Sequence, residues 1–361
     1  MWVGIGTLLA AGAAGDPAGA PINMWVGLSI IVVAGAIGGS VMAPIKYMSR
    51  WPFQNTWAVY SIWAYLILPW TLAFLTVPHL PSIYQEVSSR TLLICGVAGL
   101  AWGCAVVLGS LSMFWIGLSL SGVILMGGGT AVGSLGPLLI SRPEVLGTRS
   151  GFLLILSNVV ILAGILICAL AGRRRDQQKD STKVERMMSD DPHRFVKGVA
   201  ATAVAAVLST GFNVALFYGS EFNDLARAKG ASLANEANPM WAYTVFFGYI
   251  PNFLLSLFRL TKERMWDNYR QGGVHYWIVP ALMGMTWMGG TALYGTGSNY
   301  LGPMGPIVGW PVYMSMLILG GTFWGWWTGE WALCPTPIFR LLMIGVAVMT
   351  GGMILLNFVK I

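Results

Sequence analysis

The chain has 361 residues, of which 56% are hydrophobic and only 10% are charged, and its formal net charge is +7. A water-soluble domain carries about 25% charged residues, so this composition excludes an ordinary soluble protein and indicates that lipid covers much of the surface. In such a protein the positive charge is typical of basic loops that fix orientation in the bilayer, and it does not indicate nucleic-acid binding.

Cysteine and histidine are sparse. The four cysteines lie far apart without a C-x-x-C pair, and the three histidines form no ligand-like pair. This spacing predicts packed free thiols instead of a disulfide framework, and it predicts neither a metal site nor a cofactor.

Residues 1–24 form a short extension ahead of the first long apolar run. Its apolar part would reach only about 22 Å as a helix, short of the roughly 30 Å hydrocarbon core. Met24-Trp-Val-Gly27 repeats Met1-Trp-Val-Gly4, so both methionines are candidate starts.

Charge-free apolar runs near 20 residues, the length that a helix needs to cross the hydrocarbon core, follow along the whole chain. Two runs are more than twice that length, so each holds two crossings, with turns predicted near 112–117 and at 297–303. The sequence predicts ten membrane-spanning helices, at 25–45, 57–77, 91–141 (two), 151–171, 198–220, 237–258, 276–329 (two) and 341–359.

The Lys and Arg residues of the predicted loops are concentrated on one side of the membrane, above all in the stretch 173–197. Basic loops stay on the cytoplasmic side. The charged linker 173–197 is therefore predicted to be cytoplasmic, and both termini are predicted to face the opposite side.

Five predicted crossings precede this linker and five follow it. An odd number of crossings per half forces the halves into opposite orientations, the inverted-repeat plan of many secondary transporters. Gly99-Leu-Ala-Trp102 opens one double run and is similar to Gly284-Met-Thr-Trp287, which opens the other. The predicted fold is an all-α membrane protein of ten transmembrane helices in two inverted five-helix repeats, at 25–172 and 198–361, with the solute site between them.

No Asp or Glu lies deep within a predicted crossing, which argues against an embedded aspartyl protease or a pump with buried acid relays. The edge candidates for a proton-carrying group are Glu221, Asp224, Glu236 and Glu330. The alternative for each is a solvated helix end. We assign proton coupling to Glu330 and Glu221. Neighbouring tryptophans favour Glu330, because an apolar setting would raise the pKa of its carboxyl.

Polar and aromatic residues within the crossings indicate where a solute could bind. Asn213 lies well inside its crossing, so its amide must find partners in other helices or in a solute. Sugars present C–H faces that pack on aromatic rings and hydroxyls that need hydrogen-bond partners; for each ring the alternative is simple packing, and for Lys46 it is an interfacial lysine. The predicted substrate-binding residues are Lys46, Trp102, Ser119, Asn213, Trp287, Tyr294, Asn299, Trp310 and Tyr313.

Glycine and proline mark where helices could be interrupted. Four glycines fall within 127–133, and Pro303, Pro306 and Pro311 precede the ninth crossing. Interrupted helices free backbone groups that can line a cavity, whereas the alternative for the glycines is close helix packing.

Several short stretches, taken together in their order and spacing, are characteristic of one protein family. They are Ala43-Pro-Ile-Lys46, Trp57 with Ile67-Leu-Pro-Trp70, Ala101-Trp-Gly103, Gly117-Leu-Ser119, Lys197-Gly198, Gly211-Phe-Asn-Val-Ala215 and Gly329-Glu-Trp331. Over nearly the whole chain from Met24, this set resembles the L-rhamnose–proton symporter family of the drug/metabolite transporter superfamily.

The resemblance implies ten helices in two halves, a central cavity, and uptake of a deoxy-sugar with a proton across the bacterial inner membrane. It also implies functional roles for Lys46, Trp102, Asn213 and Glu330. The chain departs from the family pattern at Met304–Trp310, which contains no acidic residue, so a relative that takes another sugar or lacks proton coupling stays an alternative.

The sequence is compatible with three functions. The first is import of a sugar, L-rhamnose or a related monosaccharide, by proton symport with alternating access. The second is export or exchange of another small metabolite of the same superfamily. The third is a membrane-bound sugar-transferring enzyme, which should show acidic or His residues clustered at one interface. Because no such cluster is evident, the sequence predicts a transporter and not an enzyme, with a sugar, a proton and the lipid bilayer as partners and the oligomeric state open.

Overall fold

The computed structural model describes residues 23–359 except 142, 180–191, 333 and 357, so the predicted N-terminal extension lies almost wholly outside it. Within these residues every regular element is helical. In chain order the elements are α2 (Met24–Gly39), η2 (Ala43–Tyr47), α3 (Phe53–Ile62), η3 (Trp63–Ile67), α4 (Leu68–Thr76), α5 (Leu80–Glu86), α6 (Ser89–Ile116), α7 (Leu118–Ser141), η4 (Pro143–Gly147), α8 (Arg149–Lys179), α10 (Pro192–Ser209), α11 (Gly211–Tyr218), α12 (Ser220–Ala228), α13 (Asn238–Lys262), η5 (Trp266–Arg270), α14 (His275–Leu301), η6 (Gly302–Met304), η7 (Gly305–Gly309), α15 (Trp310–Trp327) and α16 (Thr336–Leu356).

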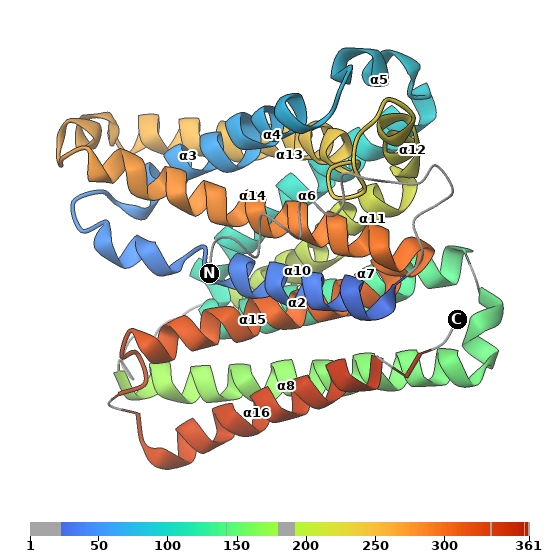
Figure 1. The fold of residues 1–361 in the computed structure, drawn as a ribbon. Helices are drawn as coiled ribbons and strands as arrows, with labels where there is room; N and C mark the ends of the chain where they lie inside the picture. Colours follow the sequence, from blue (N-terminus) through green and yellow to red (C-terminus); the bar gives the residue numbers. More distant parts are fainter. Residues whose placement is uncertain (1–22, 142, 180–191, 333, 357, 360–361) are drawn as a thin grey trace.

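The described chain has nine stretches that are long and apolar enough to cross a membrane. One of them, His275–Trp327, has 53 residues and folds back on itself, because α14 and α15 run in opposite directions (Figure 1). Because that stretch holds two helices, the nine stretches of the described residues agree with the ten predicted crossings. Helices α3 and α4, joined by η3, make one of these crossings, as do α10 and α11.

Glycines at positive φ make the two reversals. The first lies at Gly117, where φ is 82°, at the end of the predicted turn. The second lies at Gly302, where φ is 58°, within the predicted break at 297–303 and towards its end. The helix continues through Gly297 because that glycine packs against α2, where an added Cβ would lie 2.8 Å from the Gly27 carbonyl oxygen.

The long helices pair in a regular way. Helix α2 packs against α14 and α15, and α10 packs against α6 and α7. Helices α8 and α16 lie side by side at the lower edge of Figure 1. The pairings of α2 with α14 and α15 thus have counterparts five crossings along the chain in the pairings of α10 with α6 and α7.

Small residues allow these helices to approach closely. A Cβ added to Gly39 of α2 would lie 2.8 Å from Gly320 Cα of α15, and one added to Gly103 of α6 would lie 2.8 Å from Gly248 Cα of α13. Such distances leave no room for a side chain, so the glycines fix which helices can cross at these points.

The glycine-rich segment 127–133 does not interrupt its helix, which corrects one predicted break. Helix α7 is continuous through it, and a Cβ on Gly128 would lie 2.9 Å from Ala206 Cβ of α10. Close packing is therefore the reason for these glycines. The predicted interruption around Pro303 and Pro306 is confirmed, since η6 and η7 replace regular helix there, and a further one separates α10 from α11 at Thr210.

Candidate functional site

A cavity of about 200 Å³ lies between the two halves of the chain. Its wall combines residues of α6 and α7 with residues of α10, α11, α14 and α15. Five aromatic side chains line it, namely Trp102, Phe212, Trp287, Trp310 and Tyr313, and we call it the aromatic cavity. Four of these five were predicted as substrate-binding residues.

The two tryptophans of the sequence repeat meet in this cavity. The rings of Trp102 and Trp287 are stacked, with centroids 5.6 Å apart and an interplanar angle of 26°. Tyr65 packs edge-on against both, at 5.2 Å and 4.9 Å between centroids. Matching positions of α6 and α14 therefore supply one continuous aromatic wall.

Asn213 lies behind that wall and is fully buried. Its amide nitrogen donates to the carbonyl oxygens of Gly133 (2.7 Å) and Pro306 (2.8 Å), and its amide oxygen accepts from the Tyr294 hydroxyl (2.7 Å). This Asn213 cluster joins α11, α7, η7 and α14. In the present conformation the amide connects helices and does not face the cavity.

Prolines explain why the two carbonyls need Asn213. In a regular helix the Gly133 carbonyl would accept from the N–H of residue 137, but that residue is Pro137, which has no N–H. Pro311 likewise offers no N–H to the carbonyls of the turn before it. A buried carbonyl without a partner is unfavourable, so the Asn213 amide stabilises both interruptions together.

The Asn213 cluster also supports the aromatic cavity. The Tyr294 ring stacks on Tyr313, with centroids 4.6 Å apart at 22°, and lies behind it. The Trp310 indole donates to the Gly129 carbonyl at 3.0 Å. Tyr294 and Asn213 therefore hold the cavity wall in place.

Lys46 and Glu330 meet at the end of the bundle where α15 ends, at the left of Figure 1. Lys46 forms an ion pair with Glu330 and donates to the Thr328 hydroxyl. Arg175, near the end of α8, binds the other carboxylate oxygen of Glu330 at 3.0 Å, and its guanidinium lies 4.6 Å from the centroid of the Trp331 ring. This ion-pair cluster ties η2 to the segment after α15.

The predicted rise in the pKa of Glu330 is wrong. Partial burial acts to raise the pKa of the carboxyl, but hydrogen bonds and charges from Lys46 and Arg175 outweigh burial and hold this pKa below its ordinary value. Trp326 and Trp327, which suggested an apolar setting, are 52% and 67% exposed on the outer surface of the helix.

We expect Glu330→Gln to loosen the ion-pair end, because Lys46 and Arg175 would lose the carboxylate that they share. Ion pairs that are a third exposed contribute modestly, so amide hydrogen exchange in η2 and in residues 328–332 should accelerate roughly fivefold, on the scale of about 1 kcal/mol. The matched control is Asp267→Asn, which removes an exposed ion pair with Arg270 at 3.6 Å. Equal exchange in wild type and Glu330→Gln would contradict this role.

Mild acidification should not accelerate amide hydrogen exchange at the ion-pair end in the way that Glu330→Gln does. Because the pKa of folded Glu330 is lowered, its ion pairs stabilise the fold above the unfolded-state value of about 4.3 and are lost only as the pH falls through the lowered value. Exchange in η2 should therefore be similar at about pH 8 and about pH 5.5 after correction for intrinsic rates. An acceleration to the Glu330→Gln rate at the lower pH would contradict the assignment.

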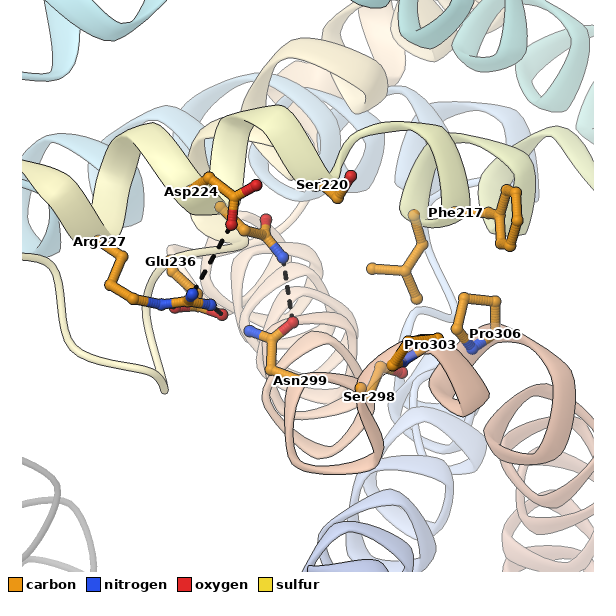
Figure 2. A pocket seen from close by; sticks show the side chains of 12 residues that line it. Phe217, Ser220, Asp224, Arg227, Glu236, Ser298, Asn299, Pro303 and Pro306 are labelled. Carbon is orange, nitrogen blue, oxygen red and sulfur yellow. Dashed lines mark hydrogen bonds and ion pairs between the residues drawn. The ribbon is translucent and has the colours of Figure 1, made fainter. Parts of the chain in front are cut away.

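A second, polar pocket of about 410 Å³ opens at the opposite end of the bundle, and we call it the vestibule pocket (Figure 2). Arg227 of α12 binds Glu236 through two hydrogen bonds of 2.9 Å and 2.8 Å, and Asp224 lies 3.6 Å from the same guanidinium. Across from them, Asn223 donates to Asn299 at 3.1 Å. Asn299 thus lines the vestibule pocket and not the aromatic cavity.

Glu221 also lies at the vestibule end. Its carboxylate accepts from the Ser88 backbone N–H at 2.8 Å, from the Ser88 hydroxyl at 2.7 Å and from the Thr91 hydroxyl. It therefore covers the amino-terminal end of α6, away from both Glu330 and the aromatic cavity.

Some functional candidates were not evident from sequence. Phe212, Arg175 and Arg227 gave no signal beyond their neighbours. Glu236 was one of the edge candidates for a proton-carrying group, with a solvated helix end as its alternative, but its burial was not evident, since its side chain is only 1% exposed. Tertiary contacts with distant helices decide all four placements. Ser119 is the second residue of α7, and its side chain lies outside the part that the structure describes.

A known protein family matches almost the entire chain. The family model described as L-rhamnose-proton symport protein (RhaT) matches residues 22–359. The chain is 26% identical over 313 residues to the L-rhamnose-proton symporters of Yersinia pestis (strain Pestoides F) and Yersinia pseudotuberculosis serotype O:3 (strain YPIII), a match that covers 84% of this chain and 88% of each relative. It is 25% identical over 311 residues, with the same coverage, to the L-rhamnose-proton symporter of Cronobacter sakazakii (strain ATCC BAA-894).

Proposed function

Because the chain belongs to the L-rhamnose-proton symport protein family, we propose that it imports L-rhamnose or a related monosaccharide together with a proton. It is a multi-pass membrane transporter and not an enzyme. We further propose that the chain lies in the inner membrane of a bacterium and belongs to the drug/metabolite transporter superfamily.

The stacked pair of Trp102 and Trp287 is the observation that carries the proposal. Aromatic faces bind the C–H faces of a sugar ring, and this pair, with Trp310 and Tyr313, lines a cavity between the halves. The Ser209 hydroxyl, which borders the same cavity, can pair with a sugar hydroxyl. Leu125, Met126, Met314 and Leu317 give part of the same wall an apolar character that suits the methyl group of a 6-deoxy sugar.

Alternating access is proposed from the two ends of the bundle. The ion-pair cluster of Lys46, Arg175 and Glu330 closes one end, while the vestibule pocket opens at the other. We propose that the ion-pair end faces the cytoplasm, since the basic linker 173–197 predicts that side. The vestibule pocket and both termini then face the periplasm, and the sugar enters from there.

The two halves are proposed to be inverted repeats, at 25–172 and 198–361. Support comes from helix pairings that recur five crossings along the chain and from the matching positions of Trp102 and Trp287. In such a plan the transition exchanges the conformations of the halves. The ion-pair cluster then breaks as the vestibule pocket closes.

Calorimetric titration of the purified protein with two sugars tests the proposed substrate. L-mannose differs from L-rhamnose only by a hydroxyl on C6, and burial of that hydroxyl against the apolar wall is unfavourable. We expect L-rhamnose to bind at least about tenfold more tightly, which corresponds to about 1.4 kcal/mol. Equal binding of the two sugars would contradict a site for deoxy sugars.

Export or exchange of another metabolite is the second candidate. The observation that favours it is the buried turn Gly305–Gly309 beside the Asn213 cluster, which carries no acidic side chain that could bind a proton. Binding of neither sugar, together with exchange of another metabolite without a proton gradient, would support this candidate.

A further inference from the structure

Glu236 stands apart from the other carboxylates that the structure describes. Its side chain is 1% exposed, and it lies in the connection between α12 and α13. Both hydrogen bonds of its carboxylate come from one guanidinium, that of Arg227, at 2.9 Å and 2.8 Å. A buried carboxylate that borders a pocket in a transporter is a candidate for proton binding.

Glu236 and the charged groups around it carry a net negative charge, which favours binding of a proton. Arg227 is shared by Glu236 and Asp224, so one positive group faces two negative groups. These two α12 residues are the charged groups that act on the Glu236 carboxyl. From α14, Ser298 and Asn299 border the same pocket and carry no charge (Figure 2). A proton on Glu236 would therefore make the group of three neutral.

Ser298 gives an independent sign that the pocket holds a ligand. Its side chain is 3% exposed, it borders the vestibule pocket, and its hydroxyl lies near the Tyr294 hydroxyl without a hydrogen bond of ordinary geometry. A buried hydroxyl without such a hydrogen bond is rare in the absence of a ligand or water. The pocket also reaches Pro306, whose carbonyl accepts from Asn213, so it extends to the Asn213 cluster.

The Arg227–Glu236 ion pair joins α12 to the segment that precedes α13. The segment before Glu236 is fixed to α14, because Thr296 donates to the Ala234 carbonyl at 2.8 Å and Asn299 donates to the Leu233 carbonyl at 3.1 Å. Arg227 belongs to α12. Loss of this pair would therefore remove one of the links between α12 and α14 at the mouth of the vestibule pocket and leave the Asn223–Asn299 hydrogen bond as another.

We propose that Glu236 takes up the coupling proton, and that Arg227 and Asp224 form the rest of the proton site in the vestibule pocket. This inference rests on the proposed function. A proton passes from periplasmic water to the Glu236 carboxylate, the hydrogen bonds from Arg227 weaken, and Arg227 remains paired with Asp224. The same proton leaves to the cytoplasm after the transition, so no further reactant is needed.

The electrostatics of the site agree with this role. Burial raises the pKa of Glu236 above its ordinary value, and the hydrogen bonds and charge of Arg227 offset only part of that rise. The carboxyl therefore protonates at a higher pH than an exposed glutamate does, closer to the range in which a proton gradient operates.

The test uses proteoliposomes that contain the full chain and radiolabelled L-rhamnose. In Glu236→Gln we expect accumulation driven by an inward proton gradient to fall at least about tenfold, as for loss of an essential proton carrier. Exchange of internal for external sugar without a gradient should stay within about twofold of wild type, because that exchange needs no net proton movement. The matched control is Glu86→Gln, which removes a 49% exposed carboxylate paired with Lys229 at the same end and should leave accumulation unchanged.

Accumulation in Glu236→Gln at the wild-type level would overturn the inference. If that variant is also inactive in exchange, Glu236→Asp decides: accumulation with a shifted pH profile supports the proton role, and an unshifted profile overturns it. If the wild type itself neither accumulates nor exchanges L-rhamnose, the proposed function fails and this inference falls with it, an outcome that differs from a defect confined to Glu236→Gln.

Discussion

Asn213→Leu is expected to reduce the initial rate of sugar transport at least about 100-fold and to destabilise the protein. Leucine has a similar volume but leaves the Gly133 and Pro306 carbonyls and the Tyr294 hydroxyl without their partner. Each buried polar group left in this way is unfavourable by about 1–3 kcal/mol. Uptake into proteoliposomes and thermal unfolding of the purified protein measure the two effects.

Tyr294→Phe is the matched control for Asn213→Leu. It removes one hydrogen bond of the Asn213 cluster but leaves both carbonyls paired, so transport should fall no more than about tenfold, the equivalent of about 1.4 kcal/mol. Wild-type transport by Asn213→Leu would show that the cluster does not support the cavity wall. Equal losses in the two variants would assign the main role to the Tyr294 hydroxyl.

Trp102→Ala and Trp287→Ala are each expected to weaken L-rhamnose binding about 10- to 100-fold. Loss of a well-packed aromatic contact in a binding site amounts to roughly 1.4–2.8 kcal/mol. Because the two rings stack on each other, the double variant should lose less than the sum of the single losses. Calorimetric titration of the purified variants gives all three affinities.

Trp326→Ala is the control for the cavity tryptophans. Trp326 is 52% exposed on the outer surface of α15, and its removal should leave the affinity for L-rhamnose unchanged. Wild-type affinity in both Trp102→Ala and Trp287→Ala would contradict binding in the aromatic cavity.

Composition and the length of charge-free apolar runs were sufficient to predict the membrane helices. Ten crossings follow from the length of apolar runs, which is a local property of the chain, and both double runs do reverse at a glycine. The exact reversal in the second run was not predictable. Gly297 and Gly302 are equally permissive in sequence, and packing of Gly297 against α2 decides which one stays helical.

The aromatic cavity was partly predictable. Trp102 and Trp287 recur in the two halves, and that recurrence indicated a shared role before their stacking was known. Asn213 was evident as a buried amide, but its partners were not. The missing N–H of Pro137 matters only once α7 lies beside α11, and no local pattern shows that contact.

The charged groups were the least predictable part. Glu330 lies next to tryptophans in sequence, but Lys46 and Arg175, which lower its pKa, come from η2 and from the end of α8. Glu236 resembled any solvated helix end, and its burial depends on how α12 and α14 enclose its segment. Long-range contacts set the electrostatics of both carboxylates, so sequence alone gave the wrong environment for each.

Uptake of radiolabelled L-rhamnose into proteoliposomes of the wild-type chain, with and without an inward proton gradient, is the most direct test of the proposed symport. We expect the gradient to drive accumulation above the external concentration and a protonophore to abolish it. Equal uptake with and without the gradient would contradict proton symport, and no uptake above empty liposomes would contradict L-rhamnose as the substrate.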